Sequence, residues 1–352
     1  MWPVIATLRV GGRAAAAGIL VALTAMTAGC AAEATVVTKS AAPAYESTYE
    51  QPAPTHIAPL RGTTVEAGSL DHAAVMAKID NHWSARPQLG LSATDIVFEE
   101  LVEGGITRYV AVWHSTVPEQ FGPVRSIRPM DPDIAAPFGG IIFYAGGQPQ
   151  FVSMMRNTPV YNAIHGQPDT ADYMFRASDR TAPHNVIAEA SKFLAAHSDI
   201  AAPTLQFAYA ADAASSTAAK EGSPTQSLDL AFSTQFRPSW TWDAASSRFL
   251  RWQDGKPDTD ASDGQQLAAT NVVTLRVPVT MSAVPKTELI GSGEAWVSTG
   301  GGTVHATWSK ASATAPITLI GDDGITVRLG AGNTWIELVP LAGSFSAVPP
   351  GA

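Results

Sequence analysis

The residues best suited to binding chemistry are five arginines in the first 200 positions, several of them beside glycine or proline turns. A guanidinium group can donate two parallel hydrogen bonds to a carboxylate or phosphate, and loops are where proteins commonly carry such groups. The sequence therefore predicts an anion-binding cleft formed by Arg108, Arg125, Arg128, Arg176 and Arg180. The alternative is that these arginines form ion pairs that hold loops together, such as Arg108 with Glu100 or Glu103 and Arg180 with Asp172 or Asp179.

A second set of polar residues is predicted to line the same cleft: Asp80, Asn81, Glu100, Glu103, Asp131, His184 and Asn185. The four carboxylates would suit Mg²⁺ or Ca²⁺, but their spacing matches no dedicated metal loop, so capping and salt-bridge roles are expected and no cofactor is predicted. His184 would serve as an acid or base near neutral pH. The alternative is that His184 or Asn185 caps a helix beginning near Val186.

Support for nucleophilic catalysis is weak. The sequence has no Gly-x-Ser-x-Gly elbow, and its glycine-rich turns lack the Lys-Ser or Lys-Thr ending of a phosphate loop. The second half carries six tryptophans that would line a carbohydrate or peptide groove, although alternating aromatic residues on strands more often belong to a core. These are Trp240, Trp242, Trp252, Trp296, Trp308 and Trp335.

The only cysteine, Cys30, closes the stretch Thr27-Ala28-Gly29-Cys30 after an apolar run that Arg9 and Arg13 precede. This order is typical of a secretory signal, and the small residues before a cysteine resemble the lipobox of bacterial lipoproteins. Residues 1–29 are therefore predicted to be a signal peptide and Cys30 a lipidated N-terminus. The alternative is an ordinary signal peptide with an incidental cysteine.

Composition narrows the classes of partner. Cleavage before Cys30 lowers the number of basic residues from 22 to 20 against 31 acidic ones, which moves the net charge from −9 to −11. An acidic chain is a poor partner for nucleic acid and has no general attraction to anionic lipid heads. Membrane attachment is therefore expected to come from acyl chains, and the expected location is extracytoplasmic.

Patterning along the chain predicts two structured regions. Residues 30–59 lack apolar periodicity and are expected to be a flexible tether. Residues 60–200 interleave apolar strands near positions 73–79, 109–113 and 141–145 with helices at 153–157 and 186–197, which favours an α/β or α+β domain with a mixed sheet. Residues 225–345 show short strands separated by Asp-Gly turns, so a mainly β C-terminal domain is expected.

Several ordered blocks carry a family resemblance. They include Asp80-Asn81-His82-x-x-Ala85-Arg86-Pro87-Gln88, Gly122-Pro123-Val124-Arg125-Ser126-Ile127-Arg128-Pro129, Pro183-His184-Asn185, Trp240-x-Trp242-Asp243 and Asp254-Gly255-x-Pro257-x-Asp260. With these blocks the chain resembles the YerB-like bacterial lipoproteins, a family without an established biochemical function. The resemblance covers most of the mature chain and implies a two-part extracytoplasmic lipoprotein.

Two functional hypotheses follow. The first is a membrane-tethered protein with a binding or scaffold role in the cell envelope, whose partners would be a cell-wall glycan, a diphosphate or an envelope protein. The second is an enzyme acting on phosphorylated or lipid-linked cell-wall glycans, in which the arginines clamp a diphosphate and Asp131 holds a metal. Convergence of three arginines and an acid in one pocket would favour the enzyme, and separate arginine–carboxylate pairs would favour the scaffold.

Overall fold

The computed structural model describes residues 50–351, so the predicted signal peptide, Cys30 and most of the predicted tether lie outside it. From Pro52 onward the chain forms one compact unit with its own hydrophobic core. The predicted tether extends to residue 59, but strand β1 (Thr55–Ile57) lies within that range and pairs antiparallel with β2 (Thr64–Glu66). Within residues 50–351, no helix combines the length and apolar character that crossing a membrane requires.

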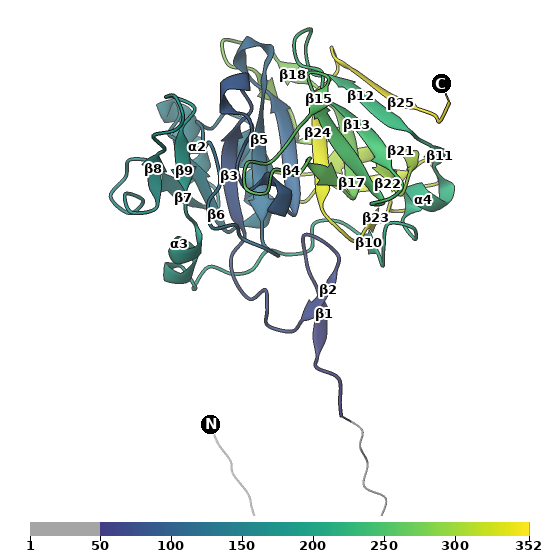
Figure 1. Ribbon diagram of the computed structural model, residues 1–352, viewed down its shortest axis with the longest axis horizontal. Coiled ribbons are helices and arrows are strands. Elements are labelled where there is room, and N and C mark those ends of the chain that lie inside the picture. The colour runs from purple at the N-terminus through teal and green to yellow at the C-terminus, as the bar shows by residue number, and fades with distance from the viewer. Residues whose placement is uncertain (1–49, 352) are drawn as a thin grey trace, which may run out of the picture. The chain divides into compact units, whose positions relative to one another are not determined.

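A large sheet of eleven strands, counted within residues 50–351, organises the molecule (Figure 1). In spatial order its strands are β11 (Ser223–Pro224), β21 (Gly302–Lys310), β20 (Gly291–Thr299), β17 (Asn271–Val277), β24 (Thr334–Pro340), β4 (Ile96–Leu101), β5 (Thr107–Trp113), β3 (Val75–Asp80), β6 (Ile141–Tyr144) and β7 (Tyr161–Ile164), with β22 (Thr318–Gly321) added to β21. The parallel pairs are β17–β24, β24–β4, β3–β6 and β6–β7, whereas β5 is antiparallel to both of its neighbours. The carboxyl ends of β17, β24, β4, β3, β6 and β7 therefore share one edge.

A second sheet of six strands has the order β15 (Lys256–Pro257), β14 (Arg248–Gln253), β13 (Ser239–Asp243), β12 (Ser227–Ala231) and β25 (Ser344–Val348), with β16 (Ala268–Ala269) on β14. Short pairs complete the strands: β8 (Met174–Arg176) with β9 (Val186–Ala188), β10 (Tyr209–Ala210) with β23 (Leu329–Gly330), and β18 (Val279–Thr280) with β19 (Lys286–Thr287). The α-helices are α1 (Asp131–Ala135), α2 (Pro149–Arg156), α3 (Ser191–Ala196) and α4 (Thr217–Glu221). The 3₁₀ turns are η1 (Trp83–Ala85), η2 (Leu91–Ala93), η3 (Glu103–Gly105) and η4 (Ala136–Phe138).

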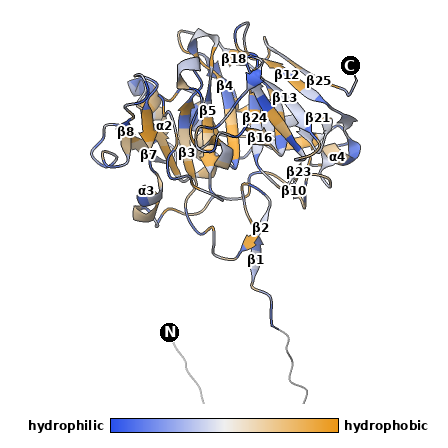
Figure 2. Cartoon of the chain, in the orientation of Figure 1, coloured by the Kyte–Doolittle hydropathy of each residue, from blue (hydrophilic) through white to orange (hydrophobic). Residues whose placement is uncertain are grey.

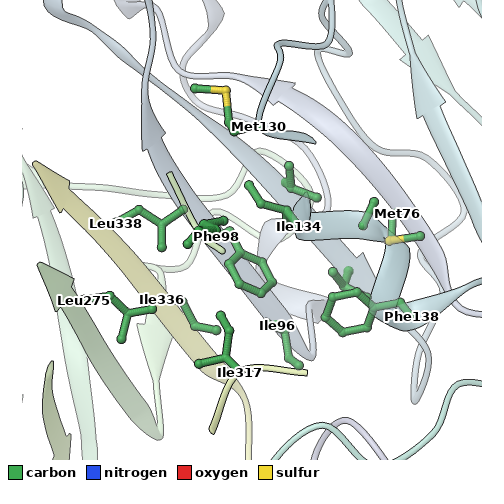
Figure 3. Close-up of a cluster of buried hydrophobic side chains, with 14 of the residues drawn as sticks. Met76, Ile96, Phe98, Met130, Ile134, Phe138, Leu275, Ile317, Ile336 and Leu338 are labelled. Carbon is green, nitrogen blue, oxygen red and sulfur yellow. The ribbon is translucent and has the colours of Figure 1, made fainter. Parts of the chain in front are cut away.

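Both faces of the large sheet are covered, and this explains why its central strands are buried along their whole length. All six residues of β3 and all seven of β5 are buried, as expected where each face carries a packing layer. Figure 2 shows hydrophobic residues concentrated along these central strands. On one face, Phe98 of β4 and Leu338 of β24 meet Ile134 of α1 and Phe138 of η4 (Figure 3). On the other face, the core of the large sheet is continuous with that of the six-stranded sheet.

The predicted fold class, a mixed N-terminal sheet followed by a mainly β region, is confirmed. The sheet itself is continuous between the two regions, because β24 pairs in register with β4 from Thr334 opposite Ile96 to Leu338 opposite Glu100. Trp240, Trp308 and Trp335 are buried in the core, which fits the core interpretation of the tryptophans. The predicted helix at 186–197 is wrong in its first part. Residues 186–188 form β9, whose backbone is held by β8 and by Phe121, and only α3 is helical.

The two sheets are joined by a buried cation, Arg251 on β14. Its guanidinium donates hydrogen bonds to Glu99 of β4 (Nη2 to Oε2, 2.7 Å), Glu337 of β24 (Nη1 to Oε1, 3.1 Å) and Asp258 (Nε to Oδ2, 2.9 Å). The ring of Trp335 lies 4.7 Å from the guanidinium carbon. Burial and the neighbouring Glu99 raise the pKa of Glu337 well above its usual value. One arginine thereby connects three segments of the chain.

Replacing Arg251 with Leu is expected to destabilise the protein by about 3–5 kcal/mol, because it leaves buried carboxylates without their cation. Urea unfolding of residues 52–352, followed by tryptophan fluorescence, measures this loss. The matched control is Arg237→Leu at an exposed position, expected within about 0.5 kcal/mol of the wild type. An Arg251→Leu midpoint equal to that of the control would contradict the assigned role.

Candidate functional site

Most of the predicted site residues meet at the carboxyl edge of the large sheet. Asp80 is the last residue of β3, and Asp131 is the first of α1. In the strand register, Arg108 at the start of β5 lies opposite both Asp80 and Glu100. Loops bring the remaining members to this edge. We name the group the charged cluster: Lys78, Asp80, Glu100, Glu103, Arg108, Arg125, Arg128 and Asp131.

Lys78 lies at the buried centre of the charged cluster. Its ammonium contacts Glu100 and, at 2.8 Å from Oδ1, Asp131. The other oxygen of Asp131 accepts a hydrogen bond from the backbone N–H of Arg128 at 2.5 Å. Burial lowers the pKa of Lys78 to about 8, and Asp131 opposes that effect. Contact with two carboxylates favours the charged ammonium, and Lys78 satisfies two of the carboxylates that were considered as metal ligands.

The three arginines of the charged cluster are each held by the chain itself. Arg125 Nε lies 3.0 Å from Asp80 Oδ2, and Arg128 Nε donates to Glu103 Oε2 at 2.6 Å. Arg108 donates to the backbone carbonyl of Ser126 at 2.8 Å. Burial, followed by repulsion from Arg128 and Arg125, lowers the pKa of Arg108 to about 10. The ion pairs suggested for Arg108 with Glu100 or Glu103 are not formed, because Lys78 and Arg128 hold those carboxylates.

The other two predicted arginines lie elsewhere. Arg176 Nη1 donates to Asn185 Oδ1 at 2.8 Å, and Arg180 donates to the carbonyls of Ala85 and Pro87 at 2.9 and 2.8 Å. Both side chains line a pocket of about 520 Å³ together with Phe175. The pairs suggested for Arg180 with Asp172 or Asp179 are absent from the salt bridges of residues 50–351. The predicted single cleft of five arginines is therefore divided in two.

His184 belongs to the charged cluster's edge rather than to a helix. Its Nδ1 lies 2.6 Å from Asp80 Oδ2, and its ring stacks on His82 with centroids 4.4 Å apart. The suggestion that His184 or Asn185 caps a helix at Val186 is wrong, because the chain is extended there as β9. Asn185 instead accepts the hydrogen bond of Arg176. A carboxylate on Nδ1 is the arrangement that orients an imidazole for proton transfer or ligand binding.

Asn81 connects the site to the interior. Its amide donates to Thr107 Oγ1 at 2.9 Å and to Glu99 Oε1 at 3.3 Å. Its oxygen accepts from Arg86 Nε at 3.0 Å and from Gln88 Nε2 at 2.9 Å. The block from Asp80 to Gln88 is thus held by side-chain hydrogen bonds on both flanks.

A mainly apolar pocket of about 820 Å³ adjoins the charged cluster. It lies at the carboxyl ends of β4, β17 and β24, where Leu101, Pro278 and Pro340 line it, and Glu103 of the cluster lies on its wall. In open sheets with parallel strands, ligands commonly bind outside this edge. The pocket is a second concave surface suited to a partner.

Whether the carboxylates are placed to bind a metal ion depends on their grouping and on their partners. Within residues 50–351, no group of three or more histidine, cysteine or acidic side chains is placed to hold a metal ion. Asp80, Glu100, Glu103 and Asp131 instead contact arginine, lysine or histidine.

Sequence reasoning missed three residues that shape the site: Lys78, Arg251 and Trp83. A lysine inside the apolar run Val75–Asp80 and an arginine inside Arg248–Gln253 were the available signals, because a charge within a buried strand needs a buried partner. Trp83 is 63% exposed, and its ring is tilted against that of His82, with centroids 3.8 Å apart. The sequence offered no comparable signal for Trp83, because single exposed aromatic residues are common on protein surfaces.

Comparisons with known proteins agree with the two-region organisation. Residues 60–202 match the N-terminal domain of DUF3048, a protein of unknown function, and residues 228–336 match the C-terminal domain of the same family. The chain is 25% identical over 296 residues to a Bacillus subtilis (strain 168) protein named "Putative lipoprotein YerB", covering 80% of this chain and 86% of that protein. The crystal structure of the YerB protein from Bacillus subtilis is similar with a TM-score of 0.71 and 24% identity, covering 83% of this chain and 99% of that one.

The pair formed by Arg128 and Glu103 gives a direct test of the charged cluster. Burial alone would raise the pKa of Glu103, but the hydrogen bond from Arg128, a backbone hydrogen bond and the charges of Arg128 and Arg108 together outweigh it, and the pKa of Glu103 is lowered. In Arg128→Gln the pKa of Glu103 is expected to rise, and carboxyl ¹³C NMR titration measures the change. Arg156→Gln, on α2, is the control and should leave the Glu103 titration unchanged. An unchanged Glu103 pKa in Arg128→Gln would show that the pair does not form in solution.

Proposed function

This chain belongs to the DUF3048 family, and from that premise we propose that it is an extracytoplasmic lipoprotein with a binding or scaffold role in the cell envelope. Lipidation of Cys30 would hold it at the cell membrane. The proposal is supported by the lipobox-like stretch that ends at Cys30 and by a relative whose name describes a lipoprotein. The acidic character of the chain also makes acyl chains the better means of attachment than charge.

The observation that carries the binding role is the charge balance of the charged cluster. Its four basic residues are Lys78, Arg108, Arg125 and Arg128, and its four acidic residues are Asp80, Glu100, Glu103 and Asp131. Phosphoryl-transfer sites need donors aimed at the position where negative charge develops. In this cluster the cations already contact carboxylates or backbone carbonyls of the chain. The arrangement favours a structural cluster beneath a binding surface over the alternative of an enzyme acting on phosphorylated glycans.

The apolar pocket beside the cluster gives this role a surface. It has about 820 Å³ of volume, and exposed apolar side chains such as Met281 and Leu341 line it. Apolar residues in a concave surface that adjoins charged groups are typical of a site for a partner or ligand. Binding at this edge requires no catalytic group.

Lipidation is tested with the full chain expressed in a bacterial host. The wild type is expected in the membrane fraction with incorporated palmitate label, whereas Cys30→Ala is expected to lose the label and at least nine-tenths of the membrane-bound material, because the acylated thiol is gone. Thr27→Leu, which places the usual lipobox residue at this position, is the matched control and should remain attached. Membrane retention of Cys30→Ala together with an unlabelled wild type would refute lipidation.

A further inference from the structure

We propose that the pocket lined by Phe175, Arg176 and Arg180 binds an acidic sugar, that is, a sugar ring carrying a carboxylate or phosphate group. The proposal rests on the proposed binding role and names a ligand class and a place for it. The pocket holds about 520 Å³, enough for a sugar unit, and is separate from the apolar pocket.

The first argument is the charge of the two arginines. In a chain with 31 acidic residues, neither Arg176 nor Arg180 has a carboxylate within 4.0 Å among the described residues. Each is positioned by neutral oxygens instead, Arg176 by Asn185 and Arg180 by two backbone carbonyls. Their positive charge is therefore not neutralised by a direct partner, unlike that of Arg125 and Arg128.

The second argument is the geometry of the remaining donors. Arg180 uses one hydrogen of each terminal nitrogen for the carbonyls of Ala85 and Pro87, which fixes the plane of its guanidinium. A fixed guanidinium loses little freedom on binding a carboxylate or phosphate. The pocket lining contains two arginines and one carboxylate, Asp179, so its net charge is positive and favours an anion.

The third argument is the presence of an exposed aromatic face. Phe175 is 40% exposed and lines the pocket. Aromatic rings offer flat apolar faces that pack against the C–H face of a sugar. A site for a simple inorganic anion would have no use for this ring, so the guanidinium groups and the ring together point to a sugar with an acidic group.

The test uses residues 52–352, the compact unit with its own core, and isothermal titration with defined probes. A uronic acid tetrasaccharide supplies carboxylates, glucose 6-phosphate supplies phosphate, and a neutral glucan tetrasaccharide is the uncharged probe. At least one acidic probe is expected to bind, at least tenfold more tightly than the neutral glucan, and the tighter of the two identifies the acidic group. Affinity should fall as salt rises from 0.05 to 0.5 M, because an exposed charge pair is screened.

Two sets of variants separate charge from stacking. Arg176→Gln with Arg180→Gln is expected to lower the affinity for the acidic probe at least tenfold, as is Phe175→Ala, which leaves every charge in place. Because Arg180 also holds a loop, Arg180→Lys provides a second variant that keeps the charge and loses the fork, with a smaller loss expected. Arg156→Gln is the control and should bind as the wild type does.

Equal binding of the neutral and acidic probes, wild-type affinity in the double arginine variant or in Phe175→Ala, or no binding of any probe at millimolar concentration would overturn the proposal. Each of these outcomes leaves the anchoring of the full chain through Cys30 untouched, because that result comes from fractionation and labelling. Loss of membrane attachment in the wild type would in turn overturn lipidation without affecting the titration.

Discussion

A buried arginine needs carboxylates, and most of this architecture follows from how Arg251 obtains them. Its three acidic partners come from β4, from β24 near the end of the chain and from the segment after β14. A fully buried guanidinium without partners would cost several kcal/mol, so these segments are stable only together. This explains why the six-stranded sheet cannot be regarded as an appendage. The cation that fixes it to the large sheet takes two of its carboxylates from that sheet.

The same network reaches the surface through Glu99 and Asn81. Glu99 accepts from Arg251 with one oxygen and from Asn81 and Thr107 with the other. Asn81 is followed by the turn that carries Trp83 and precedes the segment whose carbonyls hold Arg180. The buried cluster therefore sets the backbone on which the exposed groups are displayed. The buried hydrogen bonds thus position the loop whose carbonyls hold Arg180, one of the proposed ligand-binding residues. The residues that would touch a ligand need not be those that stabilise the fold.

Apolar runs in the sequence were sufficient to predict the buried central strands. The runs that became β3, β5 and β6 are apolar over several residues, and burial on both faces leaves such runs no other stable structure. The parallel pairing of β24 with β4 joins residues more than 200 positions apart, and no local pattern encodes such a register. Residues 186–188 have the apolar spacing of a helix, yet backbone pairing with Phe121 and β8 outweighs it. Helix propensity does not decide the structure where a neighbouring strand provides hydrogen-bond partners for the backbone N–H and C=O groups.

For the site, the sequence predicted which residues are candidates for binding but not which groups each of them contacts. Five arginines, several of them beside turns, were predicted to bind an anion, but Arg125 and Arg128 have carboxylate partners while Arg176 and Arg180 have neutral oxygens. That difference depends on which loop lies opposite which strand end, and it decides function. An arginine paired with a carboxylate has its charge balanced by that partner, whereas one positioned by carbonyls keeps its charge available. We therefore place the proposed anion site at the two arginines whose partners are neutral, Arg176 and Arg180, and not in the charged cluster.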